Sequence, residues 1–215
     1  MVKQIGFNVH DCQHENALGD DESALFSMHH DEQISQPGET KVQWLILAYR
    51  VPNEPTRLRA TVWRKLRSLG AIYLLNGTAL FPLDPSAERT LRALRREIID
   101  EMGGTAVLFL CDALAGAAEV KSQFNAARND EYEEIIDRCQ DFLVGLEQEV
   151  ASEHYTFAEL EENEEDFTKL QRWFDKVCAR DILAASGAQA VIDILAQCSK
   201  TLEHYADEVY QRDGN

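Results

Sequence analysis

The sequence predicts an α+β protein in which a small domain with the element order βαββαβ precedes a helical, acidic region. Short apolar runs of strand length alternate with helical spacing between residues 42 and 112. From residue 118 onward the apolar spacing is helical throughout, and the sign of the local charge changes between the two parts. At 215 residues, the chain is long enough for two small domains.

The first half of the βαββαβ domain begins with a buried strand. Residues 44–49 form an apolar run that Pro52 and Pro55 end. A helix is predicted over 57–69, with Thr56 as its N-cap and a glycine after its last residue. Its core stripe has helical spacing and consists of Leu58, Val62, Leu66 and Leu69.

The second half supplies two further strands before its helix. Strands are predicted at 71–75 and 78–81, because Asn76-Gly77 between them is typical of tight hairpins. A helix is predicted from residue 84 to 102, where a proline and acidic residues in the first turn favour its start. A fourth strand is predicted at 105–110. This order is that of the split βαβ, or ferredoxin-like, unit.

Residues 118–212 are predicted to form three helices joined by short links and packed on the ferredoxin-like domain. The acidic run 159–166 is predicted to be a solvated helix start, since acidic residues favour a helix N-terminus. The apolar stripes that predict the three helices are, in chain order, Val120, Phe124, Tyr132, Ile135, Cys139 and Leu146; Phe167, Leu170, Phe174 and Val177; and Val191, Leu195, Cys198, Leu202, Tyr205 and Val209.

Residues 1–40 are predicted to be a flexible acidic extension, because they are polar and lack periodicity. They carry one Lys/Arg and eight Asp/Glu. The segment contains His10, Cys12 and His14, with His29-His30 further on. These are metal-ligand types, but their spacing matches no closed zinc pattern, so no metal site is expected.

A basic segment lies between two acidic ones. Residues 41–103 carry eleven Lys/Arg and six Asp/Glu, whereas residues 104–215 carry nine and twenty-four. Arginine forks match the geometry of phosphates and tetrahedral oxyanions. We therefore predict that this segment binds DNA or an oxyanion through an arginine-rich face made of Arg50, Arg57, Arg64, Lys65, Arg67, Arg89, Arg92 and Arg96. The alternative is that these side chains pair with the acidic helices of 118–212.

The remaining composition favours a cytoplasmic protein that is not an enzyme. Five cysteines without regular spacing suit a reducing compartment. The longest apolar runs are of strand length, and no signal peptide or membrane partner is expected. No phosphate loop, nucleophile elbow or metal-binding helix motif occurs. No catalytic residue and no cofactor are therefore predicted.

Two separated parts of the sequence resemble the N-terminal domain of the ChrB family of chromate-resistance regulators. The first part is Trp44-Leu-Ile-Leu-Ala-Tyr-Arg-Val-Pro-Asn-Glu-Pro-Thr-Arg57, continued by Val62-Trp-Arg-Lys-Leu66 and Leu69-Gly-Ala-Ile-Tyr-Leu74. The second part is Leu160-Glu-Glu-Asn-Glu-Glu-Asp166, followed by Leu170-Gln-Arg-Trp-Phe174 and Ala179-Arg-Asp181. The segments occur in the same order as in the family, and the resemblance spans residues 42–212.

The resemblance implies a transcriptional regulator that responds to chromate. Operator DNA, chromate or a similar oxyanion, and a second copy of the chain are the partners it implies. Full-length members carry a further C-terminal domain, so the expectation for this chain is a stand-alone N-terminal module with regulatory duty.

The first half is also similar to the ferredoxin-like domains of PaaX-type repressors and of the CRISPR adaptation endoribonucleases. The endoribonucleases place an acidic metal ligand at the end of their first strand, where this sequence has Arg50. Without that carboxylate, metal-assisted cleavage is not expected. The alternative to the regulator is a non-enzymatic protein-interaction module of the ferredoxin-like class.

Overall fold

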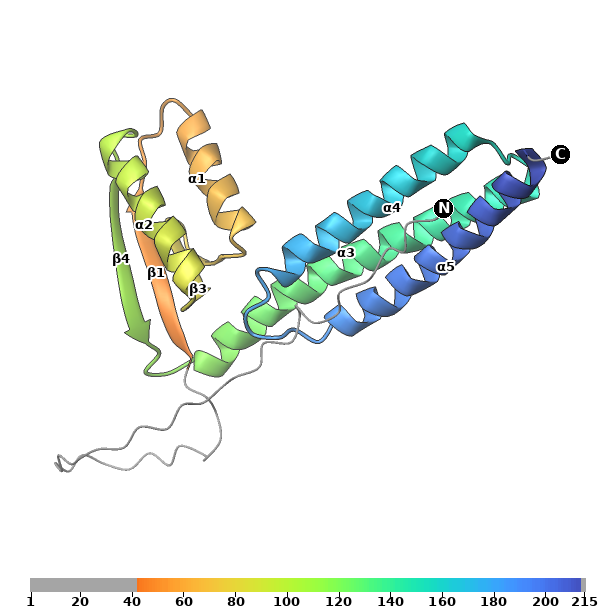
Figure 1. Ribbon diagram of the computed structural model, residues 1–215. Helices are drawn as coiled ribbons and strands as arrows, with labels where there is room; N and C mark the ends of the chain where they lie inside the picture. The colour runs from red at the N-terminus through yellow and green to blue at the C-terminus, as the bar shows by residue number, and fades with distance from the viewer. Residues whose placement is uncertain (1–41, 214–215) are drawn as a thin grey trace. The chain divides into compact units, whose positions relative to one another are not determined.

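The computed structural model describes residues 42–213, so the predicted extension 1–40 lies outside them (Figure 1). Within that range the protein is a mixed α+β structure that is mostly helical. The elements are β1 (Gln43–Arg50), α1 (Arg57–Ser68), β2 (Ile72–Leu75), β3 (Thr78–Pro82), α2 (Pro85–Asp100), β4 (Thr105–Asp112), α3 (Ala117–Ala151), α4 (Phe157–Cys178) and α5 (Ala188–Asp213).

The four strands form one antiparallel sheet with the order β2-β3-β1-β4. In its register, Ile46 of β1 lies between Leu80 of β3 and Phe109 of β4. Alternate side chains of a strand point to opposite faces, so the neighbouring Leu45 and Leu47 point the other way. That second face packs against helices α1 and α2 in a common hydrophobic core.

Helices α1 and α2 follow from their apolar stripes. Val62 and Leu66 of α1 are buried, as are Leu91, Leu94 and Ile98 of α2. Asp84 caps α2, because its Oδ2 accepts a hydrogen bond from the Ala87 N–H at 2.8 Å. An ion pair between Lys65 and Glu97 joins the two helices.

Helices α3, α4 and α5 pack on one another around a second hydrophobic core (Figure 1). The predicted solvated helix start at 159–166 lies within the first half of α4, which begins at Phe157. The core consists mainly of the predicted stripe residues, among them Tyr132, Ile135, Cys139, Leu146, Phe167, Phe174, Val191, Leu195, Cys198, Leu202, Tyr205 and Val209.

Helix α3 belongs to both cores. Its first turns contribute Phe124, which packs edge to face on Phe81 of the sheet at a centroid distance of 5.8 Å. Two turns later, Tyr132 belongs to the core shared with α4 and α5. Ile182 and Leu183, which follow α4, also pack against the core of the sheet. The helical region is therefore held to the sheet by apolar contacts from two segments.

The expectation that Thr56 caps α1 through its side chain was wrong. Thr56 has helical dihedral angles, with φ −53° and ψ −26°, and makes no side-chain cap bond. An N-cap side chain reaches the N–H of the third residue after it from an extended backbone. Thr156 at the start of α4 has that backbone, and its Oγ1 accepts from the Glu159 N–H at 3.2 Å.

These two threonines form a matched pair for a stability measurement. We expect Thr156→Ala to lower the free energy of unfolding by about 1 kcal/mol, because it removes a cap bond. Thr56→Ala is expected to change it by less than about 0.5 kcal/mol. Urea unfolding followed by circular dichroism measures both. Equal losses in the two variants would contradict the assignment of the caps.

Candidate functional site

Two adjoining pockets lie between helix α1 and helix α3, with volumes of about 420 Å³ and about 340 Å³. Both are lined by Arg67, Glu131 and Glu134. The larger pocket is completed by Arg64, Ser68, Trp173 and Arg180. The smaller is completed by Trp63, Ala71, Tyr73, Ala127, Arg128 and Asp130. Arginines from three segments therefore surround the same space.

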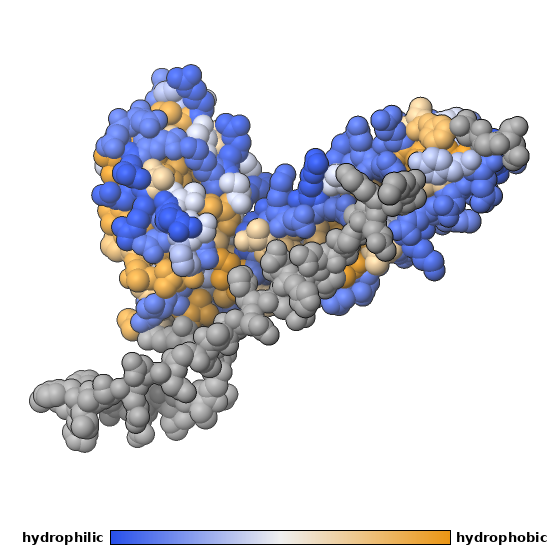
Figure 2. Space-filling view, in the orientation of Figure 1, coloured by the Kyte–Doolittle hydropathy of each residue, from blue (hydrophilic) through white to orange (hydrophobic). Residues whose placement is uncertain are grey.

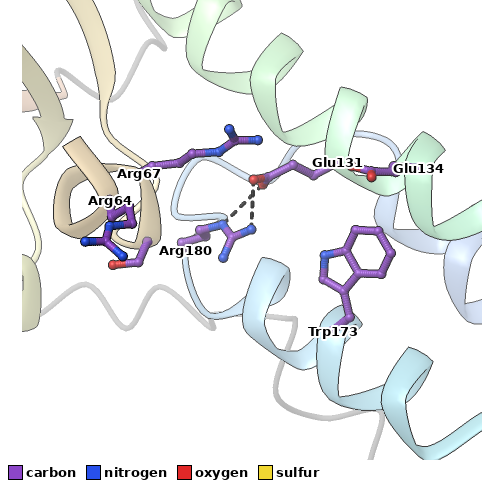
Figure 3. A pocket seen from close by; sticks show the side chains of 7 residues that line it. Arg64, Arg67, Glu131, Glu134, Trp173 and Arg180 are labelled. Atoms are coloured by element: carbon purple, nitrogen blue, oxygen red, sulfur yellow. Dashed lines mark hydrogen bonds and ion pairs between the residues drawn. The ribbon is translucent and has the colours of Figure 1, made fainter. Parts of the chain in front are cut away.

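The carboxylate of Glu131 is the centre of this arrangement. Arg180 donates to it twice, from Nη2 to Oε1 at 2.8 Å and from Nε to Oε2 at 3.2 Å (Figure 3). Nε of Arg128 forms an ion pair with Oε2 at 3.2 Å. Arg67 extends from α1 into the same space in Figure 3. One carboxylate is thus shared by two guanidinium groups, with a third nearby.

Arg128 is the most unusual of these side chains because it is only 4% exposed. Its guanidinium lies 5.3 Å from the ring centroid of Phe124. Nε and Nη1 are buried without a hydrogen-bond partner among the described residues, since the approach of Nε to Glu131 lacks hydrogen-bond geometry. Burial lowers the pKa of Arg128, and the charge of Glu131 opposes that shift. The cation is therefore desolvated and only partly compensated.

The next carboxylate, Asp181, is already engaged. Its Oδ2 accepts from the Tyr132 hydroxyl at 2.9 Å, and both of its oxygens accept from the Ala185 N–H. Burial, followed by the charge of Asp181, raises the pKa of Tyr132, so the phenol stays protonated as a donor. The two pockets together contain four arginines and three acidic side chains, within a chain of net charge −17.

The residues predicted from the sequence are distributed over two surfaces. Arg64 and Arg67 line the pockets. On α2, Arg92 pairs with Glu88, with Nη2 2.6 Å from Oε1. The flank of α2 that carries Arg92 faces β4, because Arg95 on that flank donates to the Ala106 carbonyl. The other predicted side chains are exposed, with Lys65 paired to Glu97 and no ion pair among the described residues for Arg50, Arg57, Arg89 and Arg96.

The alternative in which the basic segment pairs with the acidic helices can be compared with these contacts. Among the described residues, no ion pair joins a Lys or Arg of 50–96 to an acid of 118–212. The acids of α3 that line the pockets beside α1 are Asp130, Glu131 and Glu134, and Glu131 pairs with Arg128 and Arg180 instead. Trp63 of α1 is half exposed, and the Arg67 guanidinium lies 5.2 Å from its ring centroid.

Sequence reasoning missed Arg128 and Arg180. Both lie in the strongly acidic part of the chain, which obscured them in a count of local charge. A signal was present for Arg128: it stands four residues after Phe124 and four before Tyr132, on the stripe of α3 that faces the cores. An arginine at a core-facing position is rarely fully buried unless it is paired.

These observations describe an α+β chain whose mostly helical second half meets its sheet domain at an arginine-lined pair of pockets. The family model for the N-terminal part of protein ChrB matches residues 59–215. The chain therefore belongs to the ChrB N-terminal family, as the resemblance indicated, although the matched range begins within α1. No curated protein and no solved structure matches it.

Two further findings concern the described residues 42–213 alone. They contain no group of three or more His, Cys, Asp or Glu side chains placed to hold a metal ion. The histidines and the cysteine of residues 10–30 lie outside this range. No helix in the same range is both long enough and apolar enough to cross a membrane.

Gly70 makes room for Arg128 and allows a direct test of the packing. Gly70 has φ +80°, and a Cβ there would lie 2.1 Å from Nη1 of Arg128. Gly103 also has a positive φ, of +64°, but a Cβ there would meet nothing within 4 Å. We expect Gly103→Ala to cost about 1–2 kcal/mol for its backbone conformation. Gly70→Ala should cost more, since it adds the steric conflict.

A double variant separates the two contributions in urea unfolding. In an Arg128→Met background the excess cost of Gly70→Ala over Gly103→Ala should shrink, because Nη1 is gone. An excess that is the same in both backgrounds would contradict the contact between Gly70 and Arg128.

Proposed function

We propose that this chain is a chromate-resistance-type regulatory module that binds a small oxyanion between α1 and α3 and catalyses no reaction. Membership of the ChrB N-terminal family supports the regulatory class. The observation that carries the binding proposal is Arg128, which is 4% exposed and has two unpartnered nitrogens at a pocket lined by further arginines.

The burial of Arg128 favours a binding role over a purely structural one. Removing a guanidinium from water is costly, and an apolar residue of similar volume often stabilises a protein by more than a buried ion pair. The ion pair with Glu131 offsets part of this desolvation cost, but Arg180 forms an ion pair with the same carboxylate. An oxyanion bound in the adjoining pocket would supply the missing negative charge.

The arginines around Arg128 suit a ligand with several acceptor oxygens. Arg64 and Arg67 come from the last two turns of α1, and Arg180 follows α4. The planar forks of Arg64 and Arg67 can each donate two hydrogen bonds, which matches the edges of a tetrahedral oxyanion. Glu131 holds Arg180 in place for this task through its paired hydrogen bonds.

The proposal includes the division of the chain into two parts. Residues 42–112 would form a ferredoxin-like domain, and the order β2-β3-β1-β4 with α1 and α2 on one face of the sheet supports this. Residues 118–212 would form a helical region packed on it, which the separate core of α3, α4 and α5 supports.

Titration of the purified chain by calorimetry with sulfate and molybdate, at constant ionic strength, tests the anion site. Molybdate shares the tetrahedral shape of chromate without oxidising thiols. We expect one saturable site, and at least about tenfold weaker binding in Arg128→Met, a loss of about 1.4 kcal/mol. Arg138→Met on the same helix, where Arg138 is exposed and paired with Asp141, should bind like the wild type.

Stability distinguishes a binding role from a structural one. For a binding role, the free energy of unfolding of Arg128→Met without anion should be unchanged or higher, because a desolvated cation is removed. A strong loss of stability in Arg128→Met, together with anion binding equal to that of the wild type, would overturn the proposal.

DNA binding by α2 is a second candidate, and a specific observation favours it. Arg89 and Arg96 are exposed and have no ion-pair partner among the described residues. We expect Arg89→Ala with Arg96→Ala to reduce the slope of log affinity against log salt by about 2, since each phosphate contact contributes about 0.9. Binding to upstream DNA at several salt concentrations measures this, and an unchanged slope would exclude α2 as the contact.

A further inference from the structure

Strand β4 is an edge of the sheet along its whole length. Its eight residues pair with β1, and among the described residues no strand pairs with its other side. An edge strand presents a row of unpaired N–H and C=O groups to solvent. From Thr105 to Cys111 the strand contains no charged residue, no proline and no glycine. The charged groups at this edge are Asp112, which ends the strand, and Arg95 of α2, which donates to the Ala106 carbonyl.

The exposed side chains of β4 are apolar on both faces of the sheet. Val107 and Phe109 are 49% and 50% exposed, and Leu110 on the other face is 57% exposed. Figure 2 shows hydrophobic surface at the left margin of the sheet, where Figure 1 places β4. Apolar surface on both faces of one unpaired strand indicates that the edge itself is covered when the protein functions.

The opposite edge of the sheet differs. Strand β2 has four residues, and its pairing with β3 is irregular between Tyr73 and Leu75. Short strands and bulges are ways in which proteins prevent edge-to-edge pairing. Leu75 is 73% exposed there, so it provides a matched control for an apolar residue at an edge that is not suited to pairing.

The flank of α2 above β4 carries a self-complementary pattern. Arg95 on this flank donates to the Ala106 carbonyl at 3.1 Å, whereas Glu97 on the other flank pairs with α1. The stripe that contains Arg95 also contains Glu88, Arg92 and Ile99, because these positions are three or four residues apart. It combines one exposed apolar residue with charges of both signs.

We infer that β4 pairs antiparallel with β4 of a second copy of this chain, around a two-fold axis at the middle of the strand. The product is an eight-stranded sheet with the helices of both copies on one face. A two-fold axis of this kind places Asp112 of each copy opposite the uncharged start of β4 of the other, so it creates no like-charge contact along the strand. The exposed Phe109 and Leu110 of both copies lie beside the axis.

The geometry of α2 fits the same axis. The middle of β4 is two to three residues from Ala106, or about 7–10 Å at 3.3 Å per residue. Along a helix this distance corresponds to about five to seven residues, which leads from Arg95 back to the segment between Glu88 and Arg92. Glu88 of each copy then faces Arg92 of the other, and this charge complementarity selects a second copy as the occupant.

The distance between the two helices is also suitable. Helix α2 packs on both β1 and β4, so its axis lies between them. Across the two-fold axis, two such positions are two strand spacings apart, or about 10 Å. This is the usual separation of packed helices. The groove between them would bury Leu110 and Ile99 of both copies.

Sedimentation velocity of the full chain over a range of concentrations tests this inference. We expect a wild-type dimer, and at least tenfold weaker association for Phe109→Glu and Leu110→Glu. Leu75→Glu at the opposite edge should associate like the wild type. Circular dichroism identifies any variant that fails to fold.

A charge exchange on the surface of α2 provides a second test that does not depend on core packing. Glu88→Arg should weaken association, because it places like charges across the axis. The double variant Glu88→Arg, Arg92→Glu should restore it, since the exchanged pair is again complementary. A monomeric wild type, association unaffected by Phe109→Glu and Leu110→Glu, or no rescue by the double variant would each overturn the inference. In the first case β4 would be free for a strand of a different protein.

Discussion

The sharing of one carboxylate, that of Glu131, by Arg128 and Arg180 is the constraint on which the proposed site depends. Glu131 lies on α3, Arg180 follows α4, and the Arg128 guanidinium fits against Gly70 at the end of α1. This cluster therefore lies at the boundary between the hydrophobic core of the sheet and that of the helices. Two guanidinium groups share one carboxylate in this cluster, so its positive charge is only partly compensated.

The distribution of charge separates the acidic surface of this chain from the arginine-lined pockets at which we propose anion binding. The acidic side chains of α3 and α4 are largely on the solvated faces of these helices, as the hydrophilic surface in Figure 2 shows. The arginines occupy the pockets and the outer flank of α2. For an anion at the proposed site, long-range repulsion by the chain would be opposed at short range by arginines, of which the buried Arg128 acts more strongly than a solvated charge.

Local pattern predicted the helices and strands between residues 42 and 213, because apolar spacing and turn residues act over a few residues. Side-chain contacts between distant segments were not predictable in this way. Thr56 and Thr156 precede similar helical patterns, yet the backbone conformation of each threonine decided which of them caps a helix through its side chain. Arg64 and Arg67 were found through local charge, whereas Arg128 and Arg180 act through Glu131 and depend on tertiary packing. The exposed edge at β4 also depended on strand order, which periodicity does not encode.

Helix α3 is continuous from Ala117 to Ala151, so a tilt at one end would displace the other end. From Arg128 to Ala151 the helix extends for about 35 Å at 1.5 Å per residue. A rigid rod of that length converts a tilt of five degrees at one end into a displacement of about 3 Å at the other. A rearrangement of the guanidinium groups beside α1 that tilted α3 by this angle would therefore move the far end of the helix by about 3 Å.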